Sequence, residues 1–210
     1  LNVAGPAVSA ETSLMVSQIL TESYMEMIQG QCLDLGFESR TDVMVDAYLE
    51  MIAFKTGALI KSGLEIGALL GSDDPAAFLA FSRFGSGVGR AFQIRDDYLG
   101  IWGDQATTGK AAGNDIRRRK KTFPVVYALE KTSGPARQEL LRVYGQEELD
   151  DDDIDRVLTI LDEVGAKEQS HTITQTSARE ALEALTPLNL PGWAQAEAQA
   201  LVDFLANREF

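Results

Sequence analysis

Long stretches of the chain carry hydrophobic residues at spacings of three and four, which is the period of an α-helix. The residues that set this pattern are Val16, Leu20, Tyr24, Met27 and Ile28; Ile154, Val157, Leu161 and Val164; Ala178, Leu182 and Leu185; and Ala194, Ala198, Leu201 and Leu205. No run alternates between hydrophobic and polar residues as a half-buried strand would. The pattern therefore predicts an all-α protein.

Proline and glycine positions agree with long helices, because proline interrupts a helix interior. The longest uninterrupted stretch lies between the first two of the six prolines, which are Pro6, Pro75, Pro124, Pro135, Pro187 and Pro191. Gly165 is expected to end a helix. Gly63, Gly67 and Gly71 lie four apart and are expected to let helices pack closely. We therefore expect one all-α domain over residues 1–210, made of roughly eight helices.

The composition is that of an ordinary globular protein, with 210 residues, 45% hydrophobic and 24% charged. The single cysteine, Cys32, cannot form an internal disulfide, which fits a reducing, cytoplasmic location. No run of about 18 uncharged apolar residues occurs, so no membrane span is expected.

The charge is strongly negative overall but uneven along the chain. A formal net charge of −13 disfavours nucleic acid as a partner, because its phosphates would be repelled. The densest acidic run, "QEELDDDDID" (Gln146–Asp155), is interpreted as an exposed connection whose acids favour the start of the next helix. Between Ala106 and Lys131, by contrast, seven basic residues stand against two acidic ones. A basic segment in an acidic protein indicates a local anionic ligand.

The segment "FQIRDDYLGIWGD" (Phe92–Asp104) places two adjacent acids inside an otherwise apolar run. On a helix, the residues Gln93, Asp96, Asp97, Gly100 and Asp104 share one face. Two close carboxylates repel unless they are solvated or share a proton or a cation. This face is either a solvated surface or a site for Mg²⁺, which takes one or two carboxylates and fills its other positions with water and phosphate.

The basic segment "DQATTGKAAGNDIRRRKKT" follows directly and favours the second interpretation. A metal ion and converging lysines are what a diphosphate needs, because together they share the negative charge of a leaving group. Asp97 lies about 100° around the helix from Asp96. Asp96 is therefore expected to hold the metal, and Asp97 to act through water or a lysine.

Five segments resemble, in order and spacing, motifs of the trans (all-E) isoprenyl diphosphate synthases. They are "GQCLDLGFE", "FKTGALI", "FQIRDDYLGIWGD", "TGK" and "GNDIRRRKKT", and the resemblance runs from about Gln29 to the final "LVDFLANREF". It implies an isoprenoid-synthase-type helical bundle around a central cavity, and a homodimer. It also implies a Mg²⁺-dependent prenyltransferase that couples dimethylallyl, geranyl or farnesyl diphosphate to isopentenyl diphosphate.

The resemblance gives three kinds of role to the matching residues. The metal ligands, at the head of the second aspartate-rich motif, would be Asp96 and Asp97. The catalytic contacts to the diphosphate and the nascent cation would be Lys55, Thr56, Gln93, Lys110 and Lys120. Supporting positions in the cavity and the basic loop would be Gln31, Asp34 and Asp115.

The chain departs from the family pattern in two places. Gly100 stands where the motif DDxxD has its last acid, and Gly100→Asp is expected to be tolerated. Upstream of Gln31, the acids Glu11, Glu22 and Glu26 supply no first aspartate-rich motif. We therefore expect the N-terminal third of such an enzyme, with the isopentenyl diphosphate site, to be missing here. Alone, this chain should bind diphosphate weakly and catalyse nothing.

Three alternatives remain at this point. The product is expected to be geranylgeranyl diphosphate, with farnesyl or longer-chain diphosphates as alternatives. A non-catalytic subunit that modulates a catalytic partner would explain the missing motif, but not the retention of the lysines. A terpene cyclase on the same scaffold would usually lack the basic loop with its two lysines.

Overall fold

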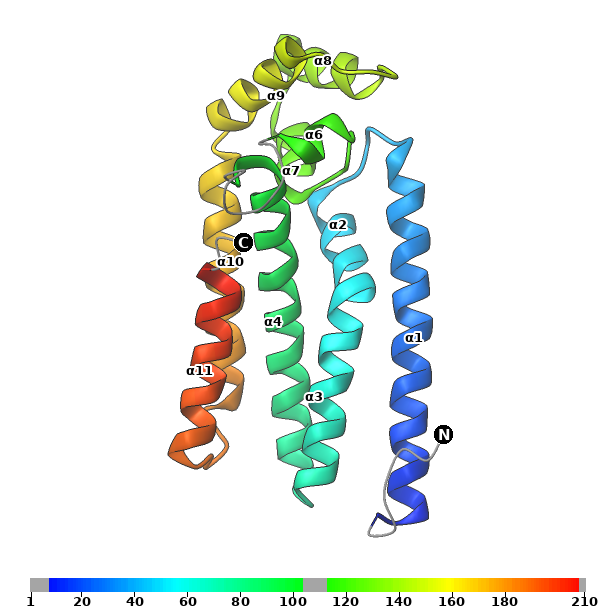
Figure 1. The fold of residues 1–210 in the computed structure, drawn as a ribbon, viewed down its shortest axis with the longest axis vertical. Helices are drawn as coiled ribbons and strands as arrows, with labels where there is room; N and C mark the ends of the chain where they lie inside the picture. The colour runs from blue at the N-terminus through cyan, green and yellow to red at the C-terminus, as the bar shows by residue number, and fades with distance from the viewer. Residues whose placement is uncertain (1–7, 104–112, 208–210) are drawn as a thin grey trace.

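The computed structural model describes residues 8–103 and 113–207, and these are built of helices (Figure 1). None of them lies in a strand, and the predicted all-α class is confirmed. The helices are α1 (Ala10–Glu38), α2 (Val45–Ile52), η1 (Ala53–Gly57), α3 (Ala58–Gly71), α4 (Pro75–Trp102), α6 (Asn114–Arg117), α7 (Phe123–Lys131), α8 (Gly134–Tyr144), α9 (Asp151–Glu163), α10 (Ala166–Leu185) and α11 (Gly192–Asn207). No described helix is both long and apolar enough to cross a membrane.

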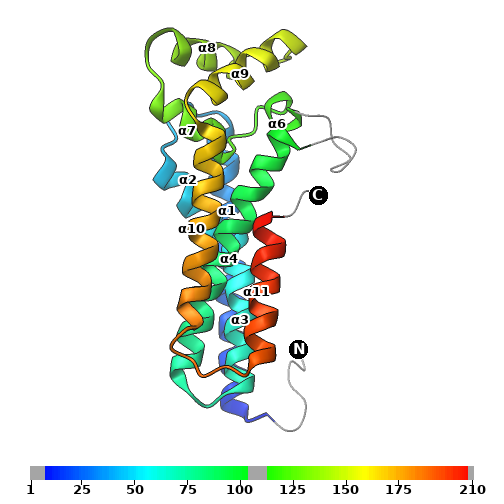
Figure 2. The same ribbon diagram turned by 90° about the vertical axis from the view of Figure 1, so that its left-hand side faces the viewer.

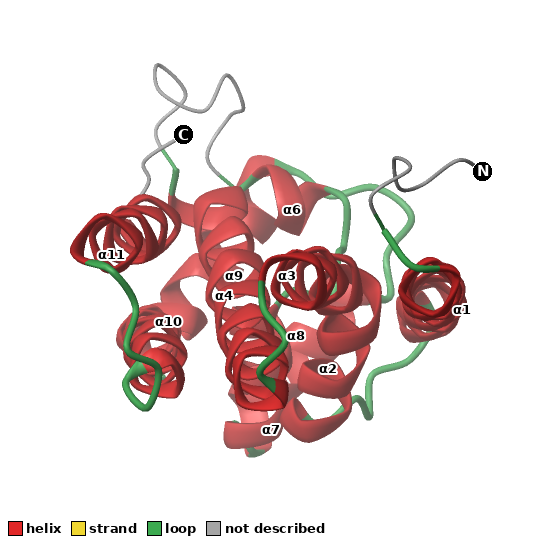
Figure 3. Cartoon of the chain, turned by 90° about the horizontal axis from the view of Figure 1, so that it is seen from below, coloured by secondary structure: helices red, strands yellow, loops and turns green. Residues whose placement is uncertain are grey.

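The long helices stand side by side with α4 in the middle. Helices α3 and α10 pack against α4, α1 packs against η1 and α3, and α11 packs against α4 and α10. Seen along the long axis, α1 and α11 lie at opposite edges (Figure 3). The short helices α6 to α9 form a cap over one end of the helical bundle (Figure 2). The acidic end of α4 therefore points into this cap.

The predicted apolar face of α9 is buried, and that of α11 is buried in part. On α9, Ile154, Val157 and Leu161 are buried in one core cluster, as expected. On α11 the predicted Ala198 and Leu205 pack against a core cluster together with the buried Val202 and Ala206, whereas Leu201 is 41% exposed. The predicted face of α11 is therefore correct in part.

Helix α1 does not follow the predicted pattern of one buried face. Val16 and Phe37 are buried, but Tyr24 and Ile28 are 54% and 58% exposed. The reason is that α1 lies at the edge and contacts its neighbours on one side only. The helix was predicted correctly, and the burial of these two residues was not.

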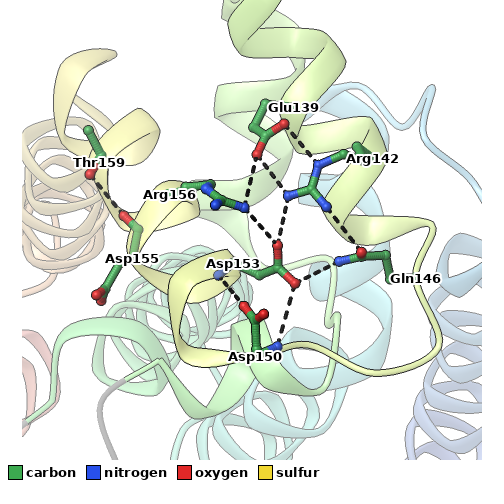
Figure 4. Close-up of polar contacts among 8 residues, drawn as sticks. All are labelled: Glu139, Arg142, Gln146, Asp150, Asp153, Asp155, Arg156 and Thr159. Carbon is green, nitrogen blue, oxygen red and sulfur yellow. Dashed lines mark hydrogen bonds and ion pairs between the residues drawn. The ribbon is translucent and has the colours of Figure 1, made fainter.

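The acidic run before α9 forms an organised helix start (Figure 4). Asp150 is the N-cap residue, and it shares a capping box with Asp153, which agrees with the predicted role of the run. Asp153 itself is buried, however, and its carboxylate accepts from Arg142 at 2.7 Å and from Gln146 at 2.8 Å. Arg142 also pairs at 2.8 Å with Glu139 of its own helix. The contact between Arg142 and Asp153 ties α8 to α9.

Gly63, Gly67 and Gly71 do not serve close helix packing, and that expectation is wrong. Within the described ranges, no atom of a neighbouring element lies within 4 Å of a Cβ placed on any of them, and together with Trp193 of α11 they line an apolar groove. Gly165, in contrast, ends α9 as predicted, with a φ of 69° that favours glycine.

Candidate active site

Helices α2, η1 and α3 form one continuous rod whose middle turn is π-helical. Lys55 and Thr56 lie in this turn, and such turns are frequent at functional sites. The neighbouring helices reach the turn at positions without side chains. A Cβ on Gly30 of α1 would overlap the backbone nitrogen of Lys55, and one on Gly89 of α4 would lie 2.8 Å from the Cα of Gly57. The site therefore rests on close backbone contact from both sides.

The π-helical turn is joined by side chains to α1 and α4. The Lys55 ammonium forms an ion pair with Asp34 of α1. The Thr56 hydroxyl donates to Gln93 Oε1 of α4 at 2.7 Å. Four of the predicted site residues thus come together from three elements.

Asp97 is the centre of the buried part of the site. It is fully buried, and its Oδ1 accepts from Lys120 Nζ at 3.1 Å and from Gln93 Nε2 at 3.3 Å. Its Oδ2 accepts from the backbone N–H of Phe123 at 2.8 Å and from the Tyr48 hydroxyl. Phe123 is the first residue of α7, so this carboxylate also stabilises the start of that helix. The expected contact between Asp97 and a lysine is present.

Burial and hydrogen bonding act in opposite directions on these groups. Burial raises the pKa of the Asp97 carboxyl, against the lowering effects of Lys120, Tyr48 and the Phe123 N–H. Burial also lowers the pKa of Lys120, but Asp97 and Asp115 outweigh it and the pKa lies above the ordinary lysine value. Because four donors converge on one carboxylate, we describe Asp97 and Lys120 as an ion pair. Burial and the Asp97 charge raise the pKa of Tyr48, which keeps its hydroxyl protonated as a donor.

A pocket of about 620 Å³ opens beside this buried network. It lies between the end of α1, the end of α4 and the segment from α6 to α7. Its lining residues are Asp34, Glu38, Ser39, Asp96, Gly100, Asp115, Arg118, Arg119, Lys120 and Lys121. Carboxylates and cations thus line one space, as a site for a metal ion together with an anionic ligand requires.

The two adjacent acids occupy different environments. Asp96 lines the pocket, whereas both oxygens of Asp97 are engaged by protein donors in the core. The contacts therefore favour Asp96 for a metal ion and a positioning role for Asp97, although both were predicted as ligands. Among the described residues, no three acids, cysteines or histidines group closely enough to hold a metal ion alone. One carboxylate with phosphate and water as the other ligands fits Mg²⁺.

Asp115 positions the basic segment through direct contact with Lys120. It is 8% exposed, its Oδ2 accepts from Lys120 Nζ at 3.4 Å, and its carbonyl accepts from Lys120 N at 3.0 Å. A Cβ on Gly100 would overlap the Asp115 carboxylate. Gly100→Asp therefore requires the Asp115 carboxylate to move, and the tolerance of this substitution stays a prediction.

Two predicted residues are not brought into this arrangement. Lys110 lies outside the described residues, and Gln31 is exposed on α1 and is not part of the pocket lining. Conversely, Tyr48 and the Phe123 amide were missed. Tyr48 lies seven residues before Lys55, two helical turns away, and this spacing was a signal that could have placed it near the site.

Comparison with known proteins gives a consistent result. Residues 5–161 match the family model described as polyprenyl synthetase. The short chain isoprenyl diphosphate synthase of Methanothermobacter thermautotrophicus is 36% identical over 191 residues, which are 91% of this chain and 58% of that protein. The (2E,6E)-farnesyl diphosphate synthase of Mycobacterium tuberculosis is 32% identical over 193 residues, covering 90% of this chain and 54% of that protein.

A solved structure is also similar. The geranylgeranyl pyrophosphate synthase of Corynebacterium glutamicum, complexed with isoprenyl diphosphate and magnesium, superposes with a TM-score of 0.85 at 30% identity. The superposition covers 95% of this chain and 57% of that one. The chain thus spans a little over half the length of the proteins it matches. With its all-α fold and family motifs, the chain belongs to the polyprenyl synthetase family.

Proposed function

We propose that the protein containing this chain is a Mg²⁺-dependent trans-prenyltransferase. It joins an allylic diphosphate to isopentenyl diphosphate in a 1′-4 condensation. The observation that carries the proposal is the shared pocket of Asp96, Asp115 and Lys120, beside the network that holds Lys55 and Thr56. Named relatives that make prenyl diphosphates, one of them in complex with isoprenyl diphosphate and magnesium, support the same chemistry.

Asp96 is the residue proposed to hold Mg²⁺, with diphosphate and water as the remaining ligands. When bound, the ion neutralises charge that develops on the leaving diphosphate. The predicted ligand role of Asp97 is not kept in this proposal, because its oxygens are engaged with Tyr48, Gln93, Lys120 and the Phe123 amide.

The protein residues act on the charge that forms when the allylic C–O bond breaks. The bonding electron pair leaves with the diphosphate, whose growing charge Lys120 and Lys55 stabilise, together with the predicted Lys110. Lys120 is held in place for this by Asp97 and Asp115, and Lys55 by Asp34. Thr56 and Gln93 present oxygen atoms beside the allylic cation. The alkene of isopentenyl diphosphate then forms the new C–C bond, and a proton is lost.

Geranylgeranyl diphosphate is the proposed product, with farnesyl or longer-chain diphosphates as alternatives. The named relatives include both farnesyl and geranylgeranyl synthases, so they support the reaction class more strongly than a chain length. A modulating subunit remains the second candidate. The ion pairs of Lys55 and Lys120 support the catalytic function, because they hold two ammonium groups in place for a diphosphate.

A homodimer is proposed, and the outer side of α1 supports it. The residues Leu14, Tyr24, Met25, Ile28 and Leu35 are exposed and fall within about 100° of the helix circumference. No acidic or basic residue of α1 falls within that arc. An uncharged apolar stripe on a protein of net charge −13 is typical of a protein interface. Light scattering should give twice the chain mass, and Ile28→Glu should give the single mass.

The cytoplasm is the proposed location, since Cys32 is a free, exposed thiol that suits a reducing compartment.

The decisive experiment measures incorporation of labelled isopentenyl diphosphate by the complete gene product. It is run with each allylic diphosphate, with and without a Mg²⁺ chelator. Metal-dependent formation of a longer prenyl diphosphate is expected. Absence of turnover alone, with activation of a co-expressed synthase, would favour the modulating subunit.

A further inference from the structure

Three consecutive arginines, Arg117 to Arg119, precede the pocket lysines Lys120 and Lys121. Their side chains differ in the partners that they contact. The backbone takes a left-handed conformation at Arg119, with a φ of 52°, which is unusual for a residue other than glycine. Arg117 Nη2 pairs with Asp151 Oδ1 at 2.5 Å, away from the pocket. Arg119 donates to the carbonyl of Glu147. Both outer arginines are therefore attached to the segment that leads into α9.

The two lysines that follow are also engaged. Lys120 pairs with Asp97 and Asp115. Lys121 is 3% exposed, its Nζ donates to the Glu38 carbonyl at the end of α1 at 3.3 Å, and it lies 4.7 Å from the centre of the Tyr144 ring. Any anion that draws on these ammonium groups must compete with partners already in place.

Arg118 is the exception in this basic segment. It is exposed and lines the pocket, and within the described ranges its hydrogen bonds come from its backbone N–H, whereas its guanidinium has no hydrogen bond or ion pair. Its guanidinium offers a planar fork of donors that matches two oxygens of one phosphate group. A free guanidinium at the exposed side of a pocket that contains Asp96 and Lys120 has the chemistry to bind the outer part of a phosphorylated ligand.

We propose that Arg118 is a diphosphate-binding residue, which contacts phosphate oxygens at the mouth of the pocket while Lys120 and Asp96 act deeper inside. This inference rests on the proposed function and adds a specific contact to it. Since Arg118 would touch the diphosphate before and during C–O cleavage alike, it contributes to binding and not to the chemical step. Its loss should therefore raise KM and leave kcat nearly unchanged.

The first test is calorimetric binding of inorganic pyrophosphate to the complete gene product in the presence of Mg²⁺. Arg118→Gln should weaken binding about 5- to 20-fold, the scale of one partly exposed charge-assisted hydrogen-bond pair. Arg118→Lys should fall between the wild type and Arg118→Gln, since it keeps the charge and loses the fork. The matched control is Arg117→Gln, which removes the same charge one residue away and should change affinity less than about twofold.

The second test is steady-state kinetics of the complete gene product with its allylic diphosphate. Arg118→Gln should raise KM by the same factor as the dissociation constant, with kcat within about twofold of the wild type. Equal effects of Arg118→Gln and Arg117→Gln on pyrophosphate binding would overturn the proposal, because a diffuse field would then account for both. A fall in kcat at unchanged KM would also overturn it.

Failure of the proposed function would look different. In that case the complete wild-type gene product would bind neither pyrophosphate nor prenyl diphosphates, and the substitutions would change nothing. Wild-type turnover together with unaltered binding by Arg118→Gln would remove Arg118 alone and leave the prenyltransferase proposal in place.

Discussion

The carboxylate of Asp115 fills the space that a side chain on Gly100 would need. Gly100 lies in the last turns of α4, and Asp115 lies in α6, where it contacts Lys120. Gly100 takes the place of the last acid of the DDxxD motif, and the carboxylate of Asp115 from α6 occupies the space beside it. A substitution at Gly100 should act on the lysine through Asp115.

Gly100→Ala should therefore destabilise the protein although alanine favours helix. The overlap with Asp115 should lower the free energy of unfolding by about 1–3 kcal/mol, the range for overpacking. Pyrophosphate binding should weaken with it. The control is Gly63→Ala in α3, where no atom lies within 4 Å of the new Cβ and a gain of about 0.5–1 kcal/mol is expected. Urea unfolding of both variants checks this, and a stabilised Gly100→Ala would contradict it.

The predicted catalytic lysines should each matter for turnover. In the complete enzyme, Lys55→Ala, Lys110→Ala and Lys120→Ala should each lower kcat about 10²- to 10³-fold, the scale for losing one preorganised group that stabilises developing charge. Lys131→Ala, whose ammonium pairs at the surface with Glu130, should have little effect. Similar losses in all four variants would mean that only the overall positive charge counts.

The two adjacent aspartates should separate activity from stability. Asp96→Ala should abolish Mg²⁺-dependent turnover while changing the free energy of unfolding by less than about 1 kcal/mol. Asp97→Ala should be milder in turnover per folded molecule but destabilise by about 1–3 kcal/mol, because it leaves the buried Tyr48 hydroxyl and Phe123 N–H without their acceptor. Turnover against Mg²⁺ concentration and denaturant unfolding give the two readouts. Near-normal activity in Asp96→Ala would identify these acids as an ordinary solvated face.

The network between α8 and α9 should make stability depend on pH in the acid range. Hydrogen bonds from Arg142 lower the pKa of Asp153 and of Glu139 below their ordinary values of 3.8 and 4.5. A carboxyl group with a lowered pKa stabilises the fold at pH values above its ordinary pKa. This stabilisation is lost as the pH falls through the pKa of the folded state.

The measurement is the thermal unfolding midpoint of the wild type and of Arg142→Gln between neutral and strongly acidic pH. Arg142→Gln should unfold at a lower temperature at neutral pH, and the difference should shrink as the pH falls below about 4. Arg179→Gln is the control, because its partner Glu183 is exposed. A difference that stays constant into the acid range would show that Arg142 acts by packing alone.

Much of the fold could be predicted because most helices have one apolar side. Helices α9 and α10 follow their hydrophobic spacing, and the glycine between them was readable from its residue type alone. Helix α1 was not fully readable, because it has apolar residues around its whole circumference and no sequence period says which of them meet α3. The short helices of the cap were also beyond a pattern that needs several turns to become visible.

The sequence indicated the charged residues of the candidate site together with Thr56 and Gln93, but it did not indicate Tyr48 or the Phe123 amide. Asp96, Asp97 and Lys55 stand out in the sequence because charges within apolar runs are costly, and Lys120 stands out as part of a basic run in an acidic protein. Tyr48 reads as an ordinary core aromatic, and only the folded chain brings its hydroxyl to Asp97. The contact between Gly100 and Asp115 was missed for the same reason, since Asp115 comes from a different helix.

The π-helical turn has a consequence for how this sequence can change. Such a turn holds one residue more than the α-helical turn it replaces, so removing a residue there would rotate all of α3 by about 100° against α4. Gly30 and Gly89 admit the wider turn only because they lack side chains. A larger residue at either glycine should therefore be tolerated only together with a deletion within Ala53–Gly57 that removes the wide turn. We therefore expect homologous sequences to keep these positions, together with Lys55 and Thr56, while the surrounding helices vary.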